Sequence, residues 1–329
     1  MDFLMKVSVL VPVYNLGRFI EPCLLSLLEQ QTNFDFEVIA IDDGSSDDSW
    51  AIMQRLASQW PTLRALQNKK NIGVCLTIRT LLEKAQGSYL VYVDGDDLAL
   101  PGKLQALSDH LDMNPDCGFV YHEAEVFDSD SNRATSLFSR DYYNAKYIPD
   151  RAGPEHLVQY GLFFNTSSCA FRRHDRMLDA VNMDCHVVND YSWHILNSSY
   201  LGGNIDRIPQ VYGRYRIHGS SICGSIRSSE ARRKLALQDM LAACDLALQA
   251  GMDELLVKRG KSHLWFSTAL YFLRARNWAL FDIFITDSVQ YEWFFDERHE
   301  FAWQHKNEPE RVLEKIFGCS TVYIINLTK

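Results

Sequence analysis

Leu90-Val91-Tyr92-Val93-Asp94-Gly95-Asp96-Asp97-Leu98 is the stretch of sequence that decides the fold. Its first four residues are apolar and favour extended backbone, so they predict a short strand that runs directly into three carboxylates around a glycine. Carboxylates this close repel one another, and a raised pKa or a bound cation relieves the repulsion. An all-oxygen set of ligands favours Mn²⁺ or Mg²⁺, and Gly95 would let the backbone come close to a ligand. The simpler interpretation is an acidic, solvated loop after a buried strand.

The residues before this stretch alternate between predicted strands and predicted helices. Strands are predicted over residues 7–12, 36–41 and 63–67, and helices over 19–31, 50–59 and 77–85. The first strand is apolar nearly throughout, as expected when both faces of a parallel sheet are covered. Pro12 cannot donate to a central ladder, so we expect this strand to end there. The order β-α-β-α-β-α-β with short connections predicts an open, doubly wound α/β sheet with helices on both faces.

Polar residues follow three of the predicted strands, at the point where each strand ends. They are Tyr14-Asn15, Asp42-Asp43 and Asp94-Gly95-Asp96. In open α/β sheets, ligands bind beyond the carboxyl ends of the strands. We therefore expect these three strand ends to converge on one crevice.

The overall composition limits the classes of partner. The chain has 329 residues, of which 47% are hydrophobic and 23% charged, as in ordinary globular proteins. Its net charge of −9 argues against a nucleic acid held by a broad basic surface. A small molecule that carries phosphate remains compatible with this charge, because a bound divalent cation offsets local acidity.

The cysteines and the N-terminus indicate a cytoplasmic protein. The eight cysteines are scattered singly and form no Cys-x-x-Cys pair, which favours free thiols in a reducing compartment over a zinc site. Residues 1–6 are not followed by a long apolar segment, and no later run reaches membrane-spanning length. Peripheral attachment to a membrane stays open.

The second half of the chain changes from mixed to helical composition. A helix is predicted over residues 103–113, strands over 118–121 and 166–172, and a polar segment with little periodicity over 127–140. From about residue 228, helices are predicted over 235–250, 255–276 and 278–289. The many aromatic residues of this region more often fill a core between helices than face a membrane.

Nine motifs occur in a recognisable order along the chain. They are Val11-Pro12-Val13-Tyr14-Asn15, Ser26-Leu27-Leu28-Glu29-Gln30-Gln31-Thr32, Ile41-Asp42-Asp43-Gly44-Ser45-Ser46-Asp47, Asn71-Ile72-Gly73, Arg79, Gly87-Ser88-Tyr89, Asp94-Gly95-Asp96-Asp97, Asn189-Asp190 and Arg216-Ile217-His218-Gly219-Ser220-Ser221. Each motif alone is a weak signal, and their joint order makes chance improbable. Over roughly its first 225 residues, the chain resembles family 2 glycosyltransferases of the GT-A fold, which use nucleotide-diphosphate sugars.

This resemblance implies a donor site for a nucleotide sugar, with a UDP-sugar as the expected donor. The residues that it implies for the nucleotide sugar are Pro12, Val13, Tyr14, Asn15, Asp43, Asn71, Arg79, Asp94, Gly95 and Asp96. Within this set, Asp43 would accept a hydrogen bond from the base, and Asp94 would lie near the ribose. Asp96 and His218 would bind Mn²⁺ or Mg²⁺ between the two phosphates, whereas Asp97 would cap the following segment. From the residues alone, Asp43 is equally a helix cap, Arg79 a surface residue and His218 a structural histidine.

The resemblance also implies the chemistry. Asp190 takes the position of the family's catalytic base, which removes the proton of the acceptor hydroxyl in a single displacement with inversion. As an isolated aspartate ahead of a helix, Asp190 would instead be an N-cap. The family carries Glu-Asp here, so Asn189 departs from the pattern. The Gln-x-x-Arg-Trp signature of processive synthases is absent, which favours the transfer of a single sugar.

We therefore predict two parts with different roles. Residues 1–225 would form the glycosyltransferase domain, with a nucleotide-binding half (1–100) and an acceptor-binding half (101–225), and residues 226–329 a helical C-terminal domain. The expected acceptor is a glycan or lipid-linked saccharide of a cell-surface polysaccharide, bound at the cytoplasmic face of the inner membrane. The C-terminal helices would contact the membrane, self-associate or bind the acceptor.

Two alternatives compete with this interpretation. A sugar-phosphate nucleotidyltransferase would need a glycine-rich phosphate loop after the first strand, where Pro12-Val13-Tyr14-Asn15 stands instead. A non-catalytic protein derived from a glycosyltransferase would explain Asn189, but not the joint presence of Asp43, Asp94, Asp96, Asp190 and His218.

Overall fold

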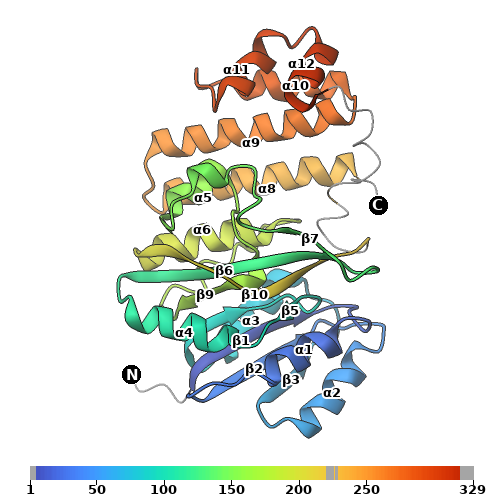
Figure 1. The fold of residues 1–329 in the computed structure, drawn as a ribbon, viewed down its shortest axis with the longest axis vertical. Helices are drawn as coiled ribbons and strands as arrows, with labels where there is room; N and C mark the ends of the chain where they lie inside the picture. Colours follow the sequence, from blue (N-terminus) through green and yellow to red (C-terminus); the bar gives the residue numbers. More distant parts are fainter. Residues whose placement is uncertain (1–4, 220–225, 227–228, 319–329) are drawn as a thin grey trace. The chain divides into compact units, whose positions relative to one another are not determined.

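A computed structural model describes residues 5–219, 226 and 229–318 of the chain. The described chain forms two compact units (Figure 1). The first unit comprises Met1–Pro154, Leu162–Cys185 and Trp193–His218, and the second comprises Glu155–Gly161, His186–Ser192 and Gly219–Lys329. This division differs from a single boundary at residue 225, because two short segments from within residues 155–192 belong with the C-terminal helices. Ser220 and Ser221 lie outside the described residues.

The first unit begins with the predicted parallel sheet. The strands β1 (Met5–Val13), β2 (Phe36–Asp42), β3 (Leu63–Gln67) and β4 (Gly87–Tyr92) are joined by the helices α1 (Ile20–Leu28), α2 (Ser49–Gln59) and α3 (Val74–Lys84). The strands pair in the order β3-β2-β1-β4, all parallel. The open α/β sheet predicted from the sequence is therefore confirmed. The prediction was possible because parallel strands covered on both faces are apolar nearly throughout.

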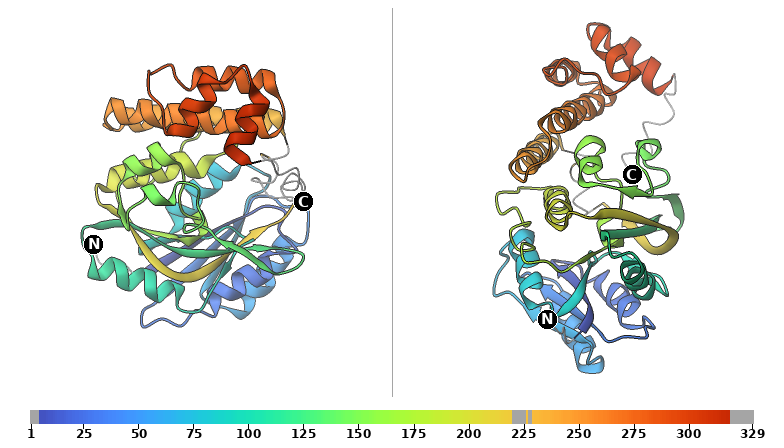
Figure 2. Two further views of the ribbon diagram at one scale, coloured as in Figure 1. Left: turned by 45° about the horizontal axis from the view of Figure 1, so that its top comes forward. Right: turned by 90° about the vertical axis from the view of Figure 1, so that its left-hand side faces the viewer.

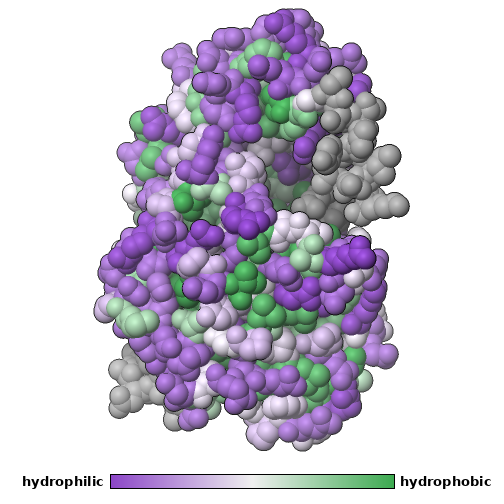
Figure 3. Space-filling model, in the orientation of Figure 1, coloured by the Kyte–Doolittle hydropathy of each residue, from purple (hydrophilic) through white to green (hydrophobic). Residues whose placement is uncertain are grey.

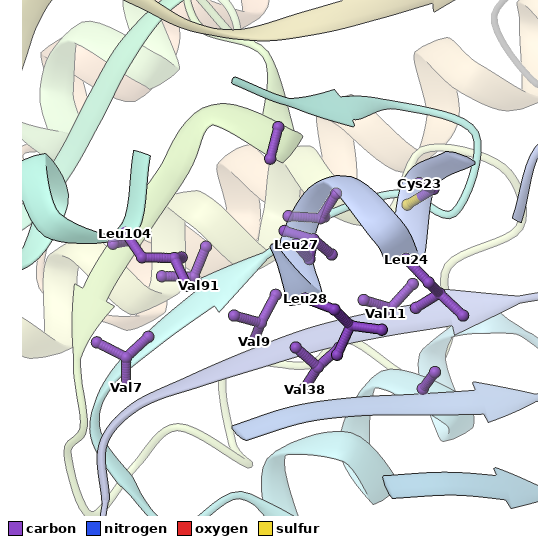
Figure 4. Close-up of a cluster of buried hydrophobic side chains, with 14 of the residues drawn as sticks. Val7, Val9, Val11, Cys23, Leu24, Leu27, Leu28, Val38, Val91 and Leu104 are labelled. Atoms are coloured by element: carbon purple, nitrogen blue, oxygen red, sulfur yellow. The ribbon is translucent and has the colours of Figure 1, made fainter. Parts of the chain in front are cut away.

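The core of this unit lies between the sheet and the helices on one face. Val9 and Val11 of β1 point toward Leu24, Leu27 and Leu28 of α1, and Val7 lies at the other end of the cluster, on the side of Leu104 (Figure 4). Leu10 lies between Val9 and Val11 in β1. Its side chain is therefore on the opposite face of the strand, where it is also fully buried. Burial of alternate residues on both faces explains why the strand shows no polar alternation.

Pro12 lies inside β1 instead of ending it. It stands in register with Ile41 of β2, whereas the pairing of β1 with β4 stops at Leu10. The carbonyl of Leu10 accepts a hydrogen bond from the Val93 N–H at 3.0 Å, so the backbone of Leu10 faces β4. Pro12, two residues on, faces the same side beyond the last paired residue of β4. The missing N–H of the proline therefore removes no ladder hydrogen bond.

The second half of the sheet mixes directions. Antiparallel β9 (Cys169–Arg172) lies between β4 and β6 (Cys117–Asp128), and β10 (Asn204–Ile217) runs parallel to β6. The short β5 (Leu98–Ala99) is antiparallel to β10, which places Leu98 opposite Arg214. The remaining elements are α4 (Lys103–Met113), β7 (Ala134–Leu137), η1 (Ala145–Tyr147), β8 (Arg151–Ala152), η2 (Thr166–Ser168) and α6 (Asn189–Leu201). The polar segment at 127–140 thus contains strand β7, paired with β6.

The second unit is helical. It contains most of α5 (Pro154–Tyr160), the first turn of α6, and the helices α8 (Glu230–Gln249), α9 (Glu254–Arg274), α10 (Trp278–Asp287), α11 (Glu297–Gln304) and α12 (Pro309–Phe317). Helices α8 and α9 lie side by side, and α10–α12 pack beyond α9 (Figures 1 and 2). Phe266, Phe272 and Phe281 are fully buried in this unit. These aromatic residues form a core between helices, as predicted.

The exposed apolar side chains of the described helical unit are distributed over several helices. On the face that Figure 3 shows, hydrophilic and hydrophobic residues are interspersed. The large exposed apolar side chains Leu248, Leu255, Ile283 and Trp303 come from four different helices. Within residues 5–219, 226 and 229–318, no helix is both long and apolar enough to cross a bilayer. Membrane contact, self-association and the cytoplasmic location stay predictions.

Candidate active site

The first two polar strand ends are joined by hydrogen bonds around Asn15. Asn15 has a positive φ of 53°, which asparagine tolerates better than most residues. Its N–H donates to Ser45 Oγ and its side-chain oxygen accepts from the Ser46 N–H, both at 2.8 Å. Tyr14 is half exposed beside it, whereas Val13 is buried. Tyr14 and Asn15 are therefore both exposed, and the Asn15 side chain already binds the Ser45–Ser46 loop.

Asp43 organises the loop that leads into α3. Its carboxylate accepts hydrogen bonds from the backbone N–H groups of Ile72 (3.0 Å) and Gly73 (2.9 Å) and from the Asn68 side chain (2.8 Å). Asn71 accepts from the same Gly73 N–H at 3.0 Å. A carboxylate offers about four acceptor positions, so the three bonds leave room for one more donor, such as a base N–H. The structural role and the predicted binding role of Asp43 are thus compatible.

Arg79 lies apart from these loops. It sits on α3, where its Nε is 3.6 Å from Glu83 Oε1 in an i,i+4 pair on the helix surface. Within the described residues, no contact joins its side chain to the other predicted nucleotide-binding residues. The structure does not bring Arg79 into the site.

Asp96 and His218 meet at the carboxyl edge of the sheet. Nε2 of His218 lies 2.8 Å from Oδ2 of Asp96, although 122 residues separate them in the chain. The His218 ring packs on Phe19 with a centroid distance of 4.6 Å. Carboxylate oxygen together with imidazole nitrogen is a donor set that suits Mn²⁺, and both side chains keep some solvent exposure. The residues present therefore fit a divalent cation.

Asp94 is oriented by two neighbours. Its Oδ1 accepts from the Tyr92 hydroxyl at 2.9 Å, and its backbone N–H donates to Ser167 Oγ at 2.9 Å. Gly95 is buried, and a Cβ atom there would lie 2.8 Å from Leu16 Cδ1 and 3.2 Å from the Pro12 carbonyl oxygen. The missing side chain at Gly95 thus lets Leu16 and the Pro12 carbonyl come close, and the predicted approach to a ligand stays a prediction.

Asp97 plays a structural part. It is 1% exposed, and its two oxygens accept from the Arg216 N–H at 2.8 Å and the Ser167 hydroxyl at 2.6 Å. It therefore does not cap the segment that follows it. Burial raises the pKa of Asp97 well above its usual range, and the neighbouring charges of Asp96 and Asp94 add to this effect. Asp94 and Asp96 are left as the partly exposed carboxylates of this turn.

Sequence reasoning missed three residues that support the turn. Arg216 donates from Nε to the Asp96 carbonyl at 2.7 Å, and its guanidinium lies over the Phe19 and Phe127 rings. Lys103, fully buried at the start of α4, donates to the carbonyl of Ser167. Arg216 was visible only as part of a motif, and no sequence pattern marked Lys103 or Ser167 as buried beneath the carboxylates.

A separate group of possible metal ligands lies elsewhere in the first unit. Ligand atoms of His110, Cys117 and Asp206 lie within 4.8 Å of one another. His110 Nε2 lies 2.9 Å from one oxygen of Asp206, and Arg151 Nε donates to the other at 3.0 Å. Because Arg151 already neutralises Asp206, this group is explained as an ion-pair network around the buried Asp206 carboxylate.

Asp190 belongs to the second unit and is not among the residues that the first unit brings together. It lies in the first turn of α6, after Asn189, and a carboxylate oxygen accepts from the Tyr191 N–H at 2.9 Å. An acidic residue in the first turn is favoured by the helix dipole. Asp190 thus lies inside the first turn of α6 and not ahead of the helix as predicted, and its role as a base stays a prediction.

Comparisons with known proteins agree on the fold. A crystal structure of TarS from S. aureus in complex with UDP-GlcNAc is similar to this chain with a TM-score of 0.61 and 16% identity, covering 98% of this chain and 89% of that one. A mannosyltransferase from Pyrobaculum calidifontis in complex with GDP-Man and Mn²⁺ has a TM-score of 0.59 and 18% identity, covering 96% and 88%. At these identities, the likeness concerns the fold alone.

Curated relatives match parts of the chain. An uncharacterized protein of Mycobacterium tuberculosis is 36% identical over 154 residues, which is 46% of this chain and 47% of the relative. An uncharacterized glycosyltransferase of Nostoc is 26% identical over 243 residues, or 71% of each chain. The first relatives are thus matched over about half of their length.

The sequence model described as Glycosyl transferase family 2 matches residues 8–177, which include both predicted nucleotide loops and the Asp94-Gly95-Asp96 turn. The matched segment is more than half of the chain, and the sheet that it encodes is the GT-A-like sheet described above. The chain therefore belongs to glycosyltransferase family 2.

Proposed function

We propose that this chain is an inverting, metal-dependent glycosyltransferase that moves one sugar from a UDP-sugar to a hydroxyl group of a glycan or lipid-linked acceptor. The observation that carries the proposal is the 2.8 Å approach of His218 to Asp96 at the carboxyl edge of the sheet. Family membership and the nucleotide sugars in the titles of similar structures support the donor class.

Each part of the reaction has a candidate residue. Tyr14, Asn15 and Asp43 would hold the base, and Asp94 the ribose. Asp96 and His218 would hold a divalent cation, which when bound supplies positive charge to the diphosphate leaving group. Asp190 would take the proton from the acceptor hydroxyl as that oxygen attacks the anomeric carbon. The bond between the anomeric carbon and the diphosphate oxygen breaks on the opposite face of the sugar, so the anomeric configuration inverts.

The test is ligand binding by the full chain. Calorimetry and thermal stabilisation are measured with UDP, UDP-GlcNAc, UDP-glucose and GDP-mannose, each with and without Mn²⁺. We expect Mn²⁺-dependent binding that Asp96→Asn abolishes. Asp35→Asn is the matched control, because Asp35 is exposed just before β2, at the opposite end of the strands.

The outcomes separate the competing functions. Failure of every nucleotide to bind in either condition would contradict the proposal. Nucleotide binding without release of UDP or GDP from any donor would favour the alternative of a non-catalytic binding protein. The nucleotide sugar that gives the largest additional stabilisation identifies the donor.

A further inference from the structure

The segment that carries Asp190 is held by a buried carboxylate of a C-terminal helix. Asp239 of α8 is 4% exposed and accepts hydrogen bonds from three successive backbone N–H groups, those of His186 (3.1 Å), Val187 (2.6 Å) and Val188 (3.0 Å). The ring nitrogen Nδ1 of His186 also lies 3.0 Å from its Oδ1. All of these residues belong to the second unit.

These hydrogen bonds are of the stronger kind. An ionised carboxylate that accepts backbone N–H groups forms charge-assisted bonds, roughly twice as strong as neutral ones. Burial by itself would raise the pKa of Asp239, but the hydrogen bonds from Val188, His186 and Val187 outweigh it, so the pKa is lowered. Asp239 therefore stays ionised at neutral pH and keeps its hydrogen bonds to the backbone of residues 186–188.

A second attachment lies directly after Asp190. The buried Tyr191 hydroxyl donates to the carbonyl of Leu157 at 3.0 Å and lies 3.3 Å from that of Val158, both in α5. Helix α5 in turn packs tightly on α9, since a Cβ atom at Gly260 would lie 2.4 Å from the Val158 carbonyl oxygen. Asp190 thus lies between two residues that are held by hydrogen bonds: it follows Val188 by two positions and directly precedes Tyr191.

We propose that the C-terminal helices position the catalytic base, with Asp239 as the positioning residue that fixes the backbone before Asp190. This inference rests on the proposed function, in which Asp190 is the base. Asp239 itself acts through the backbone of residues 186–188 and touches no reacting group. The helices after residue 229 lie beyond the family match at 8–177, so this role would make them part of the catalytic machinery.

The experiment compares Asp239→Asn with Asp245→Asn in the full chain. Asp245 lies on the same helix but pairs with Lys261 at the surface, so it is the matched control. Tyr191→Phe tests the second attachment and keeps the proposal testable if Asp239→Asn does not fold. The readouts are hydrogen exchange of the amides at 186–188, Mn²⁺-dependent UDP binding, and UDP release from UDP-GlcNAc with water as the acceptor. If UDP-GlcNAc does not bind, GDP release from GDP-mannose replaces it.

The expected result is local. In Asp239→Asn, the 186–188 amides exchange at least about tenfold faster and kcat falls about 100-fold, while the donor KM stays within twofold, because misplacement of a catalytic group costs about this much. Tyr191→Phe lowers kcat in the same direction, and Asp245→Asn changes none of the readouts.

Two other outcomes have separate meanings. If Asp190→Asn is inactive but Asp239→Asn and Tyr191→Phe keep kcat within twofold of the wild type, the positioning role is wrong and the proposed function stands. If Asp190→Asn keeps full activity, the assignment of the base fails, and the positioning role fails with it. Intact UDP binding in either case shows that the donor site is unaffected.

Discussion

The ammonium group of Lys103 donates a hydrogen bond to the backbone carbonyl of Ser167, whose own hydroxyl donates to Asp97. The buried ammonium group of Lys103 is therefore linked to the carboxylate of Asp97 through a single residue, Ser167. Burial lowers the pKa of Lys103 to about 8, although the charges of Asp97 and Asp94 oppose this shift. The positive charge under the turn is thus retained at neutral pH but becomes titratable in the mildly alkaline range.

This pKa predicts a pH-dependent difference in stability between the wild type and Lys103→Met. Between pH 8 and 10.5, the unfolded chain binds the Lys103 proton and the folded chain does not, so this group makes the free energy of unfolding rise with pH. The expected rise relative to Lys103→Met is about 2 kcal/mol from pH 7.5 to pH 10. Urea denaturation at both pH values measures it. Lys84→Met, at the exposed end of α3, is the control, and parallel pH profiles for the wild type and Lys103→Met would contradict the prediction.

Replacement of His218 should change metal preference as well as affinity. Imidazole favours Mn²⁺ over Mg²⁺, so His218→Asn is expected to weaken Mn²⁺-dependent UDP binding at least about tenfold and Mg²⁺-dependent binding less. Calorimetric titration of UDP with each cation gives the two ratios. His305→Asn, on a surface histidine beside Glu308, should leave both unchanged. An equal loss with both cations would mean that His218 contacts the diphosphate and not the metal.

Gly95→Ala should destabilise the first unit. The new methyl group would meet Leu16 and the Pro12 carbonyl inside ordinary contact distance, and overpacking of this kind costs about 1–3 kcal/mol. Gly219→Ala is the matched control, because no atom of the described residues lies within 4 Å of a Cβ atom there. Thermal and urea unfolding of the two variants decide the matter. A neutral Gly95→Ala would show that Leu16 moves aside freely.

Local patterns were sufficient to predict the first half of the fold. The apolar runs at residues 7–12, 36–41 and 90–93 are separated by helical periodicity, so the presence of these strands and their order along the chain followed from sequence alone. What could not be predicted depends on partners distant in the chain. Strand β7 forms because β6 offers it a ladder, and Pro12 stays in β1 because β4 has already ended there.

The candidate site divides in the same way. Asp43, Asp94 and Asp96 could be found because they directly follow strands. Lys103 and Ser167 could not, since a lysine at a helix start and a serine in a loop are ordinary residues until the fold buries them together. The grouping of Asp190 with the C-terminal helices is a tertiary property as well, because it depends on Asp239, 49 residues later.

The pairing of β5 with β10 has a consequence for how this site tolerates change. Leu98, two residues after Asp96, lies opposite Arg214, which is two residues before Arg216. A backbone ladder therefore joins the segment that carries Asp96 to the segment that leads to His218. The pairing of β5 with β10, and not the long chain between them, sets the distance between Asp96 and His218. The loops between β5 and β10 can then differ in length and in sequence while Asp96 and His218 keep their relative positions.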